Sequence, residues 1–357
     1  MIKRRKTRIV AVGNLKIGSG YPIVIQSMTK TNTCDVDSTT EQIQSLEKAG
    51  CELIRVAVKT AEDARAIKDI KKNINIPIAA DIHFDYKLAL EAINFGADKI
   101  RINPGNIVKK SHIRSVINCA LENNIPIRVG INSGSFKKTK VLKQNPEHIM
   151  VDELLNYLEN FRAEKFYNII ISIKSSDVVS TCGALKRIAS RCDYPIHLGV
   201  TSTGLPEDGI VKSSVGIGAL LLDGIGDTIR VSLTGESILE IETAKRILVA
   251  SGTRYFAPEI ISCPTCGRSQ VDLISVAKEL KRKLKKVKFD NLKNRNFTIA
   301  VMGCEVNGPG EAKNADIGIA FGKNRGAIFR KGKIVETVDV TIAVNRLIEM
   351  ISENVTL

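Results

Sequence analysis

Aromatic residues are scarce in this chain of 357 residues, which has no tryptophan and in which phenylalanine and tyrosine together make up 4%. Proteins that bind single-stranded nucleic acid stack bases on aromatic side chains, and this composition offers few such platforms. Long apolar runs are also missing. The basic start, Lys3 to Arg8, is followed only by Ile9 to Val12 before a glycine, which is too short for the apolar part of a signal peptide. We therefore predict a cytoplasmic protein without a membrane span.

Acidic residues are fewer than basic ones, since 38 Asp and Glu stand against 53 Lys and Arg and give a net charge of +15. Such an excess fits a nucleic acid, an anionic small molecule or an acidic protein partner. The shortage of aromatics disfavours nucleic acid. The densest basic run, Lys278 to Lys288, has Leu280, Leu284 and Val287 at helical spacing. This spacing predicts a solvated amphipathic helix, with docking of an acidic protein as the alternative.

Short runs of β-branched residues recur eight times in the first 235 residues, and each is followed by a helical pattern. Eight strand–helix units predict a (β/α)8 TIM barrel of the α/β class. A doubly wound open sheet is the competing arrangement. The expected strands are Ile23–Met28, Leu53–Val58, Pro77–His83, Lys99–Pro104, Pro126–Asn132, Asn168–Ser175, Pro195–Thr201 and Thr228–Thr234.

Polar residues occupy these strands, although buried parallel strands are normally apolar. Many lie two or four residues apart, which places them on one strand face, and barrel enzymes hold their active sites at the carboxyl ends of the strands. Asp81 is essentially the only acid among them, so the positive charge needs an external anion, and arginine forks suit a diphosphate. The residues concerned are Arg55, Arg101, Asn103, Arg128, Asn132, Ser172, Lys174, His197, Thr201, Arg230 and Ser232.

The character of the chain changes after Gly252, and we expect two domains, residues 1–256 and 257–357. Thr253 to Ile260 reads as a linker. The second domain is predicted to be small and of the α+β class. Its expected elements are strands at Phe297–Gly303 and Ile317–Phe321, a hairpin around Lys331, and a final helix at Val340–Ile351.

Cys263 and Cys266 form a Cys-x-x-Cys turn, which is a common metal-binding arrangement. A closed zinc site needs two further Cys or His ligands, but only Cys304 follows and no histidine comes after His197. Cys304 opens a run in which a Gly-Pro-Gly turn can return Glu311 towards the metal. Three thiolates and one carboxylate suit a [4Fe-4S] cluster. The alternative is a redox-active Cys pair with Cys304 merely buried.

The chain resembles the 4-hydroxy-3-methylbut-2-enyl diphosphate synthase family of iron-sulfur enzymes over nearly its whole length. The motifs that carry the resemblance are Gln26-Ser-Met-Thr29, Ala80-Asp-Ile-His83, Arg101-Ile-Asn-Pro-Gly-Asn106, Arg128-Val-Gly-Ile-Asn132, Gly226-Asp-Thr-Ile-Arg-Val-Ser-Leu-Thr234, Cys263-Pro-Thr-Cys266 and Met302-Gly-Cys-Glu-Val-Asn-Gly-Pro-Gly-Glu311. The resemblance implies a TIM barrel followed by an iron-sulfur domain similar to modules of sulfite and nitrite reductases. It also implies a homodimer in which the cluster of one chain faces the barrel of the other.

The resemblance further implies a reaction. The substrate would be 2-C-methyl-D-erythritol 2,4-cyclodiphosphate, which undergoes two-electron reductive ring opening and dehydroxylation with electrons from flavodoxin or ferredoxin. The residues implied to hold the diphosphate are Arg55, Arg101, Arg128, Asn132, Lys174, Arg230 and Ser232. We add Asp81, His83, Asn103 and His197 as substrate contacts.

One position departs from the family pattern. Where relatives commonly carry a glutamate, proposed as an acid or base, this chain has Ser202. We expect Glu207, Asp208 or a water molecule to replace it, and we regard Glu207 and Glu311 as the candidate catalytic residues. Two other functions remain open from the residues alone: an aldolase with Lys174 as a Schiff-base lysine, and a basic RNA-binding protein with a structural metal.

Overall fold

The computed structural model describes residues 2–135, 146–287, 289, 296–305 and 312–355. Its internal contacts divide the chain into two compact units, Met1–Thr253 and Arg254–Leu357. The boundary falls next to the one expected at residues 256 and 257. No helix in the described ranges is both long and apolar enough to cross a membrane.

The first unit is a barrel of eight parallel strands, as the sequence predicted. The strands follow one another around the sheet in the order β8-β7-β6-β5-β4-β3-β10-β9. They are β3 (Val24–Met28), β4 (Leu53–Val58), β5 (Ile78–Ile82), β6 (Lys99–Ile102), β7 (Ile127–Asn132), β8 (Ile169–Lys174), β9 (His197–Leu198) and β10 (Thr228–Ile229).

Backbone hydrogen bonds join the two ends of this sheet. The N–H of Ile171 in β8 donates to the carbonyl of Pro195 at 2.9 Å, and the N–H of Thr201 donates to the carbonyl of Ser175 at 3.2 Å. A parallel bridge also links Ile171 with Ile196, directly before β9. These bonds close the sheet, so the open doubly wound alternative is wrong.

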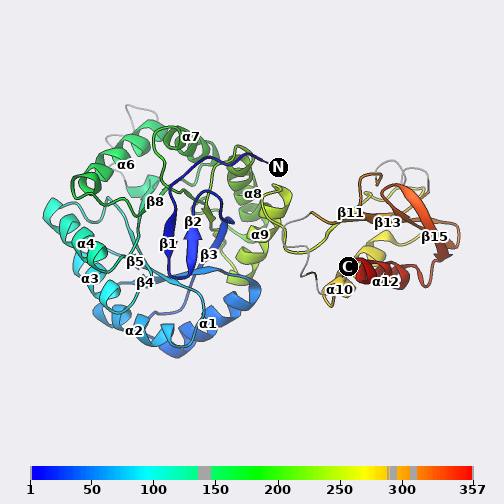
Figure 1. The fold of residues 1–357 in the computed structure, drawn as a ribbon, viewed down its shortest axis with the longest axis horizontal. Helices are drawn as coiled ribbons and strands as arrows, with labels where there is room; N and C mark the ends of the chain where they lie inside the picture. The colour runs from blue at the N-terminus through cyan, green and yellow to red at the C-terminus, as the bar shows by residue number, and fades with distance from the viewer. Residues whose placement is uncertain (1, 136–145, 288, 290–295, 306–311, 356–357) are drawn as a thin grey trace. The chain divides into compact units, whose positions relative to one another are not determined.

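Helices surround the strands as an outer ring (Figure 1). Local signals set their ends: Thr60 and Asp63 form a reciprocal capping box at the start of α2, and Gly50 takes the left-handed conformation, with φ of 101°, after α1. The ring consists of α1 (Val36–Ala49), α2 (Ala61–Lys71), α3 (Tyr86–Asn94), α4 (Lys110–Glu122), α6 (Pro146–Ala163), α7 (Val178–Ala189), α8 (Pro206–Leu222) and α9 (Ser237–Ala250), with a short 3₁₀ turn at Ser133–Ser135.

A hairpin that the sequence analysis did not predict closes one end of the barrel. Strands β1 (Val10–Val12) and β2 (Leu15–Ile17) pair antiparallel and lie across the centre of the ring in Figure 1. Their apolar side chains pack against residues at the amino-terminal ends of the barrel strands. The resulting buried cluster contains Val10, Val12, Ile17, Val24, Leu53, Ala79 and Ile170. The opposite end, where the strands finish, carries the loops that lead into the helices.

Within its described residues, the second unit consists of a mixed five-stranded sheet and two helices. Strands β11 (Glu259–Ser262), β12 (Thr298–Met302) and β13 (Ile317–Gly322) are parallel, whereas β14 (Arg325–Arg330) and β15 (Lys333–Asp339) continue antiparallel. Helices α10 (Leu273–Leu284) and α12 (Ala343–Val355) pack on one face through Leu280, Leu284 and Leu347. The segment Thr253 to Ile260, which was expected to be a linker, therefore ends inside β11. This strand has only four residues, too few to show a recognisable sequence pattern.

Candidate active site

Ionisable side chains from six neighbouring strands gather inside the barrel. The parallel register sets Asp81 opposite Arg101, and Arg101 opposite Arg128. Their side chains are buried, apart from that of Arg55, which is 12% exposed. The residues are Arg55 on β4, Asp81 on β5, Arg101 on β6, Arg128 on β7, Lys174 on β8 and His197 on β9. We call Arg55, Arg101, Arg128, Lys174 and Arg230 the basic cluster.

Asp81 is the carboxylate partner of two members of the basic cluster. Nη1 of Arg101 donates to Oδ1 of Asp81 at 3.0 Å, and Nε of Arg55 lies 3.6 Å from Oδ2. Burial acts to raise the pKa of Asp81, but the charges of Arg55, Arg101 and Arg128 outweigh it and lower this pKa to about 2. Asp81 is therefore ionised at neutral pH and fixes the orientation of Arg101.

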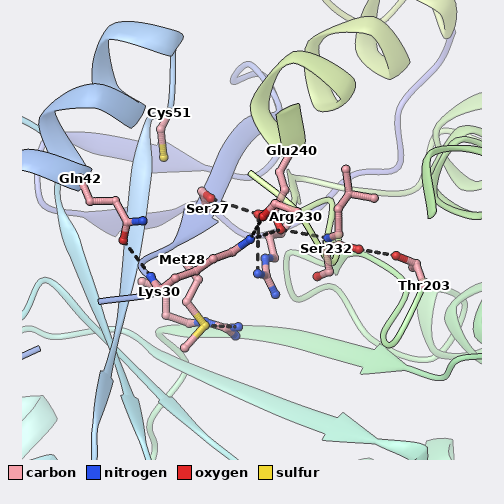
Figure 2. Close-up of polar contacts among 12 residues, drawn as sticks. Ser27, Met28, Lys30, Gln42, Cys51, Thr203, Arg230, Ser232 and Glu240 are labelled. Carbon is pink, nitrogen blue, oxygen red and sulfur yellow. Dashed lines mark hydrogen bonds and ion pairs between the residues drawn. The ribbon is translucent and has the colours of Figure 1, made fainter. Parts of the chain in front are cut away.

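Glu240, in the first turn of α9, is a second buried carboxylate that the sequence analysis missed. Its Oε1 accepts from the N–H of Leu233 at 2.9 Å, and its Oε2 accepts from Oγ of Ser27 at 3.3 Å. Nη2 of Arg230 lies 3.6 Å from Oε2, and Nζ of Lys30 lies 3.9 Å from Oε1 (Figure 2). Alternation along the strands predicts only side chains that the strands carry, whereas Glu240 reaches the site from a helix.

Lys174 and His197 are linked inside the barrel. Nζ of Lys174 lies 3.2 Å from Nε2 of His197, whose Nδ1 lies 2.6 Å from Oγ1 of Thr228. Burial, followed by the charge of Arg128, lowers the pKa of Lys174 well below its ordinary value; burial, followed by the charge of Lys174, does the same to the pKa of His197. His197 is therefore a neutral imidazole at pH 7. The tautomer that suits both contacts accepts at Nε2 and donates from Nδ1.

Several guanidinium donors of the basic cluster have no hydrogen-bond partner within the described residues. They are Nε and Nη1 of Arg128, Nε of Arg101 and Nε of Arg230. Arg128 is only 1% exposed, so water does not satisfy these donors freely. In the contacts described above, two carboxylates, Asp81 and Glu240, face the four arginines of the basic cluster. These contacts therefore contain fewer negative than positive groups. A buried cation without a partner is unfavourable, and an anion with several oxygens would compensate it.

Other predicted substrate contacts lie at the carboxyl ends of the strands. Nδ1 of His83 is 3.1 Å from the carbonyl of Asp81, and Oδ1 of Asn103 accepts from the N–H of Gly105 at 3.1 Å. Asn132 ends β7 and is half-buried, in register with Lys174. Ser232 is half-buried, and its carbonyl accepts a hydrogen bond from Oγ1 of Thr203. These four residues border the basic cluster at the carboxyl ends of the strands.

Glu207 does not join this buried set. It lies in the first turn of α8 and is exposed. Ser202, in the loop before it, is also exposed and has a positive φ of 53°. Thr203, between them in the chain, is buried. The loop thus directs the hydroxyl of Thr203 inwards and leaves both Ser202 and Glu207 towards solvent.

The cysteines of the second unit lie on adjacent loops. Cys263 directly follows β11, Cys304 comes two residues after β12, and these strands pair in parallel. The N–H of Gly303 donates to Sγ of Cys263 at 3.4 Å. Hydrogen bonds from the backbone and side chain of Arg268 lower the pKa of the exposed Cys266 thiol. A thiol with a lowered pKa and a sulfur that accepts N–H bonds are features of thiolate metal ligands.

The fourth predicted ligand, Glu311, lies outside the described residues. Among the residues that are described, no three His, Cys, Asp or Glu side chains lie close enough together to form a metal site. The donor set of Cys263, Cys266 and Cys304 nevertheless fits an iron-sulfur cluster chemically, because all three are soft sulfur ligands on neighbouring loops.

Comparison with known families matches both units. Residues 7–245 match the GcpE TIM-barrel domain and residues 259–353 match the GcpE protein C-terminal domain. A curated protein of Thermodesulfovibrio yellowstonii named 4-hydroxy-3-methylbut-2-en-1-yl diphosphate synthase (flavodoxin) is 51% identical over 353 residues, covering 98% of this chain and 99% of that protein. A protein of the same name from Fusobacterium nucleatum is 49% identical over 352 residues, covering 98% of each chain.

Solved structures add support for the barrel alone. Dihydropteroate synthase of Yersinia pestis superimposes with a TM-score of 0.51 at 12% identity, covering 69% of this chain and 98% of that chain. The enzyme of Xanthomonas albilineans gives a TM-score of 0.52 at 13% identity with the same coverage. At such low identity the likeness concerns the fold and not the chemistry.

Proposed function

Because the chain belongs to the GcpE family of 4-hydroxy-3-methylbut-2-en-1-yl diphosphate synthases, we propose that it reduces 2-C-methyl-D-erythritol 2,4-cyclodiphosphate to 4-hydroxy-3-methylbut-2-enyl diphosphate. The reaction opens the ring and removes one oxygen as water, with two electrons. The single observation that carries the proposal is the basic cluster, whose buried guanidinium donors have no hydrogen-bond partner in the part of the chain that the structure describes. Membership of this family argues against both the aldolase and the RNA-binding alternatives.

The basic cluster supplies the anchor for the diphosphate. Arg55, Arg101, Arg128, Lys174 and Arg230 provide the charge, and arginine forks can each donate two hydrogen bonds to phosphate oxygens. Asp81 and Glu240 hold Arg101 and Arg230 in position. The side chains proposed to donate or accept hydrogen bonds at the edge are His83, Asn103, Asn132, His197 and Ser232. Such an anchor leaves the carbon skeleton of the substrate facing the open end of the barrel.

We assign the cofactor as a [4Fe-4S] cluster held by Cys263, Cys266, Cys304 and Glu311. When bound, such a cluster would supply single electrons, and the carboxylate of Glu311 would be a harder ligand for iron than the three thiolates. The chain contributes the lowered pKa of Cys266, which favours the thiolate, and the Gly303 N–H, which stabilises negative charge on the sulfur of Cys263.

The electron donor is proposed to be flavodoxin, which the names of the relatives specify, with ferredoxin as the alternative donor. We also propose a homodimer in which the cluster of one chain faces the barrel of the other. Large apolar side chains on loops and helix starts beyond the strand ends support a protein partner at this opening. They are Phe84, Val108, Val179, Leu205 and Ile238, with exposed fractions of 76%, 72%, 73%, 61% and 40%.

The proton that leaves with the oxygen as water needs a donor. Glu207 lies in the first turn of α8, which follows the carboxyl end of β9, and its side chain is exposed rather than buried with the basic cluster. We propose Glu207 as the acid or base, with Asp208 or water as the alternative route for the proton, and Glu311 as a catalytic residue through its place in the cluster site. A cytoplasmic location, where thiols stay reduced, is part of the same proposal.

Anaerobic purification followed by iron, sulfide and zinc assays tests the cofactor, and ³¹P NMR of the cyclic diphosphate with a chemical reductant tests the reaction. We expect iron and sulfide in wild type, loss of both in Cys304→Ser, and retained iron with strongly reduced turnover in Glu311→Ala. Zinc without sulfide in the wild-type protein would contradict the proposal. Cys192→Ser, which removes a half-buried thiol of the barrel unit, is the matched control.

A further inference from the structure

Lys99 is a buried lysine inside the barrel to which the proposed mechanism gives no role. It is the first residue of β6, pairs in register with Ala79, and lies two positions before Arg101. Residues two apart leave a strand on the same face, so Lys99 and Arg101 both belong to the inner face. Two residues of a parallel strand span about 7 Å, which places the Lys99 backbone that much deeper than Arg101.

Within the described residues, no ion pair is formed by the amine of Lys99. Lys99 is 1% exposed, and its Nζ is buried without a hydrogen-bond partner within the described residues. The layer beneath it, formed by the β1–β2 hairpin, is apolar: Val10, Val12 and Ile17 pack there. An ammonium ion in such surroundings is strongly unfavourable, whereas a neutral amine is tolerated more readily.

The charged groups that face Lys99 are mostly positive. Arg128 on β7 and Arg55 on β4 act on it most strongly, and Lys99 in turn acts on His197 of β9. On β5, Asp81 is held by Arg55 and Arg101. Lys174 on β8 lies under the influence of the same arginines. Burial, and after it the charges of Arg128 and Arg55, lower the pKa of Lys99 well below its ordinary value.

A diphosphate in the basic cluster reverses this balance. It brings at least two negative charges next to Arg128 and Arg55, the two residues whose positive charge disfavours an ammonium at Lys99. An anion at short range in a region of low dielectric favours protonation of a neighbouring amine.

We propose that Lys99 is a charge-compensating residue of the diphosphate site, whose amine takes up a proton from solvent when the anion enters the barrel. The inference rests on the proposed function, because it requires a diphosphate at the basic cluster. In the anion-free barrel the buried amine is neutral. With the anion present it becomes an ammonium ion and adds one positive charge beneath the bound phosphates.

Calorimetric titration of the holoenzyme with inorganic diphosphate, and then with the cyclic diphosphate, tests this. Titrations at pH 7.5 in two buffers of different ionisation enthalpy give the number of protons taken up on binding. We expect Lys99→Met, which keeps the length and removes the amine, to take up fewer protons than wild type by up to about one and to bind about tenfold more weakly. Lys87→Met, an exposed lysine on α3, should match wild type in both quantities.

The outcomes separate the two proposals. If wild type binds neither anion, the proposed function fails and this inference fails with it. If wild type binds both but Lys99→Met takes up as many protons as wild type, only the role of Lys99 is overturned. A merely structural role would instead lower the thermal unfolding midpoint of the anion-free variant and leave its proton count unchanged. We expect the opposite, a raised unfolding midpoint, because Lys99→Met removes a buried amine that has no hydrogen-bond partner among the described residues.

Discussion

Glu240 and Arg230 face each other inside the barrel with 3.6 Å between Oε2 and Nη2, although one lies on α9 and the other follows β10. Glu240 also accepts from Ser27 and from the N–H of Leu233. One carboxylate therefore joins β3, the segment after β10 and the following helix. The stability of this side of the barrel should depend on its charge.

Glu240→Gln should lower the free energy of unfolding of the barrel by about 2 kcal/mol, because hydrogen bonds to a buried charge are lost or weakened. Urea unfolding followed by circular dichroism measures this. Glu242→Gln, on the same helix but 52% exposed and paired with Arg246, is the control and should cost less than about 1 kcal/mol. Equal losses in the two variants would show that Glu240 has no special role.

Arg128→Met should weaken the binding of inorganic diphosphate by about 100-fold, since a buried charged contact is typically worth a few kcal/mol. Iron and sulfide content should remain at the wild-type level, because Arg128 belongs to the barrel unit and the cysteines to the other. Calorimetry measures the affinity. Arg65→Met, whose parent side chain is 61% exposed on α2, should bind as wild type does. Normal binding by Arg128→Met would remove this residue from the anchor.

Asp81 should give the barrel a stability that depends on acid pH. Its pKa of about 2 in the folded protein lies below the ordinary 3.8, so its contribution is complete above about pH 4 and is lost as the pH falls towards 2. The difference corresponds to about 2 kcal/mol. Urea unfolding between pH 5 and pH 2.5 should show this loss in wild type and not in Asp81→Asn. Parallel pH curves for the two proteins would contradict the assignment.

The exposed basic residues of α10 should serve electron delivery. Reversing Lys278, Lys281 and Lys285 to Glu should slow turnover with reduced flavodoxin about tenfold at low ionic strength, because steering of an acidic partner depends on charge. Turnover with a small chemical reductant should not change. Reversing Lys72, which is 63% exposed on the barrel, is the control. Equal slowing with both reductants would indicate damage to the cofactor site instead.

The sequence predicted the barrel well because each strand is a compact apolar run followed by a helical pattern, and all eight expected strands contain an observed one. The side chains of Arg101, Arg128 and Lys174, which the sequence analysis placed on the inner face, are buried in the structure, and their role as substrate contacts stays a prediction. Glu240 was not predicted as a site residue because a glutamate in the first turn of a helix usually stabilises the helix dipole. Its burial beside Arg230 becomes evident only in the folded barrel. Lys99 was not predicted to be buried, because a lysine at the start of a strand is normally an exposed flanking residue.

The second unit was harder to predict at its edges. Ile317 to Phe321 and the turn at Lys331 were found in place, and the basic run does form an amphipathic helix up to Leu284. β11 was hidden in the expected linker because a four-residue strand carries little periodicity. The ligand set stays a prediction, since Glu311 lies outside the described residues.

The β1–β2 hairpin covers the amino-terminal ends of the barrel strands. Among the described residues, Val10, Val12 and Ile17 pack over that end of the barrel, so we expect substrate and product to pass through the opening at the carboxyl ends of the strands. A new substrate molecule can therefore enter only after the product has left. We expect the product to be a competitive inhibitor of substrate binding. We also expect release of the product, a more highly charged diphosphate, past the arginines of the basic cluster to limit the turnover rate.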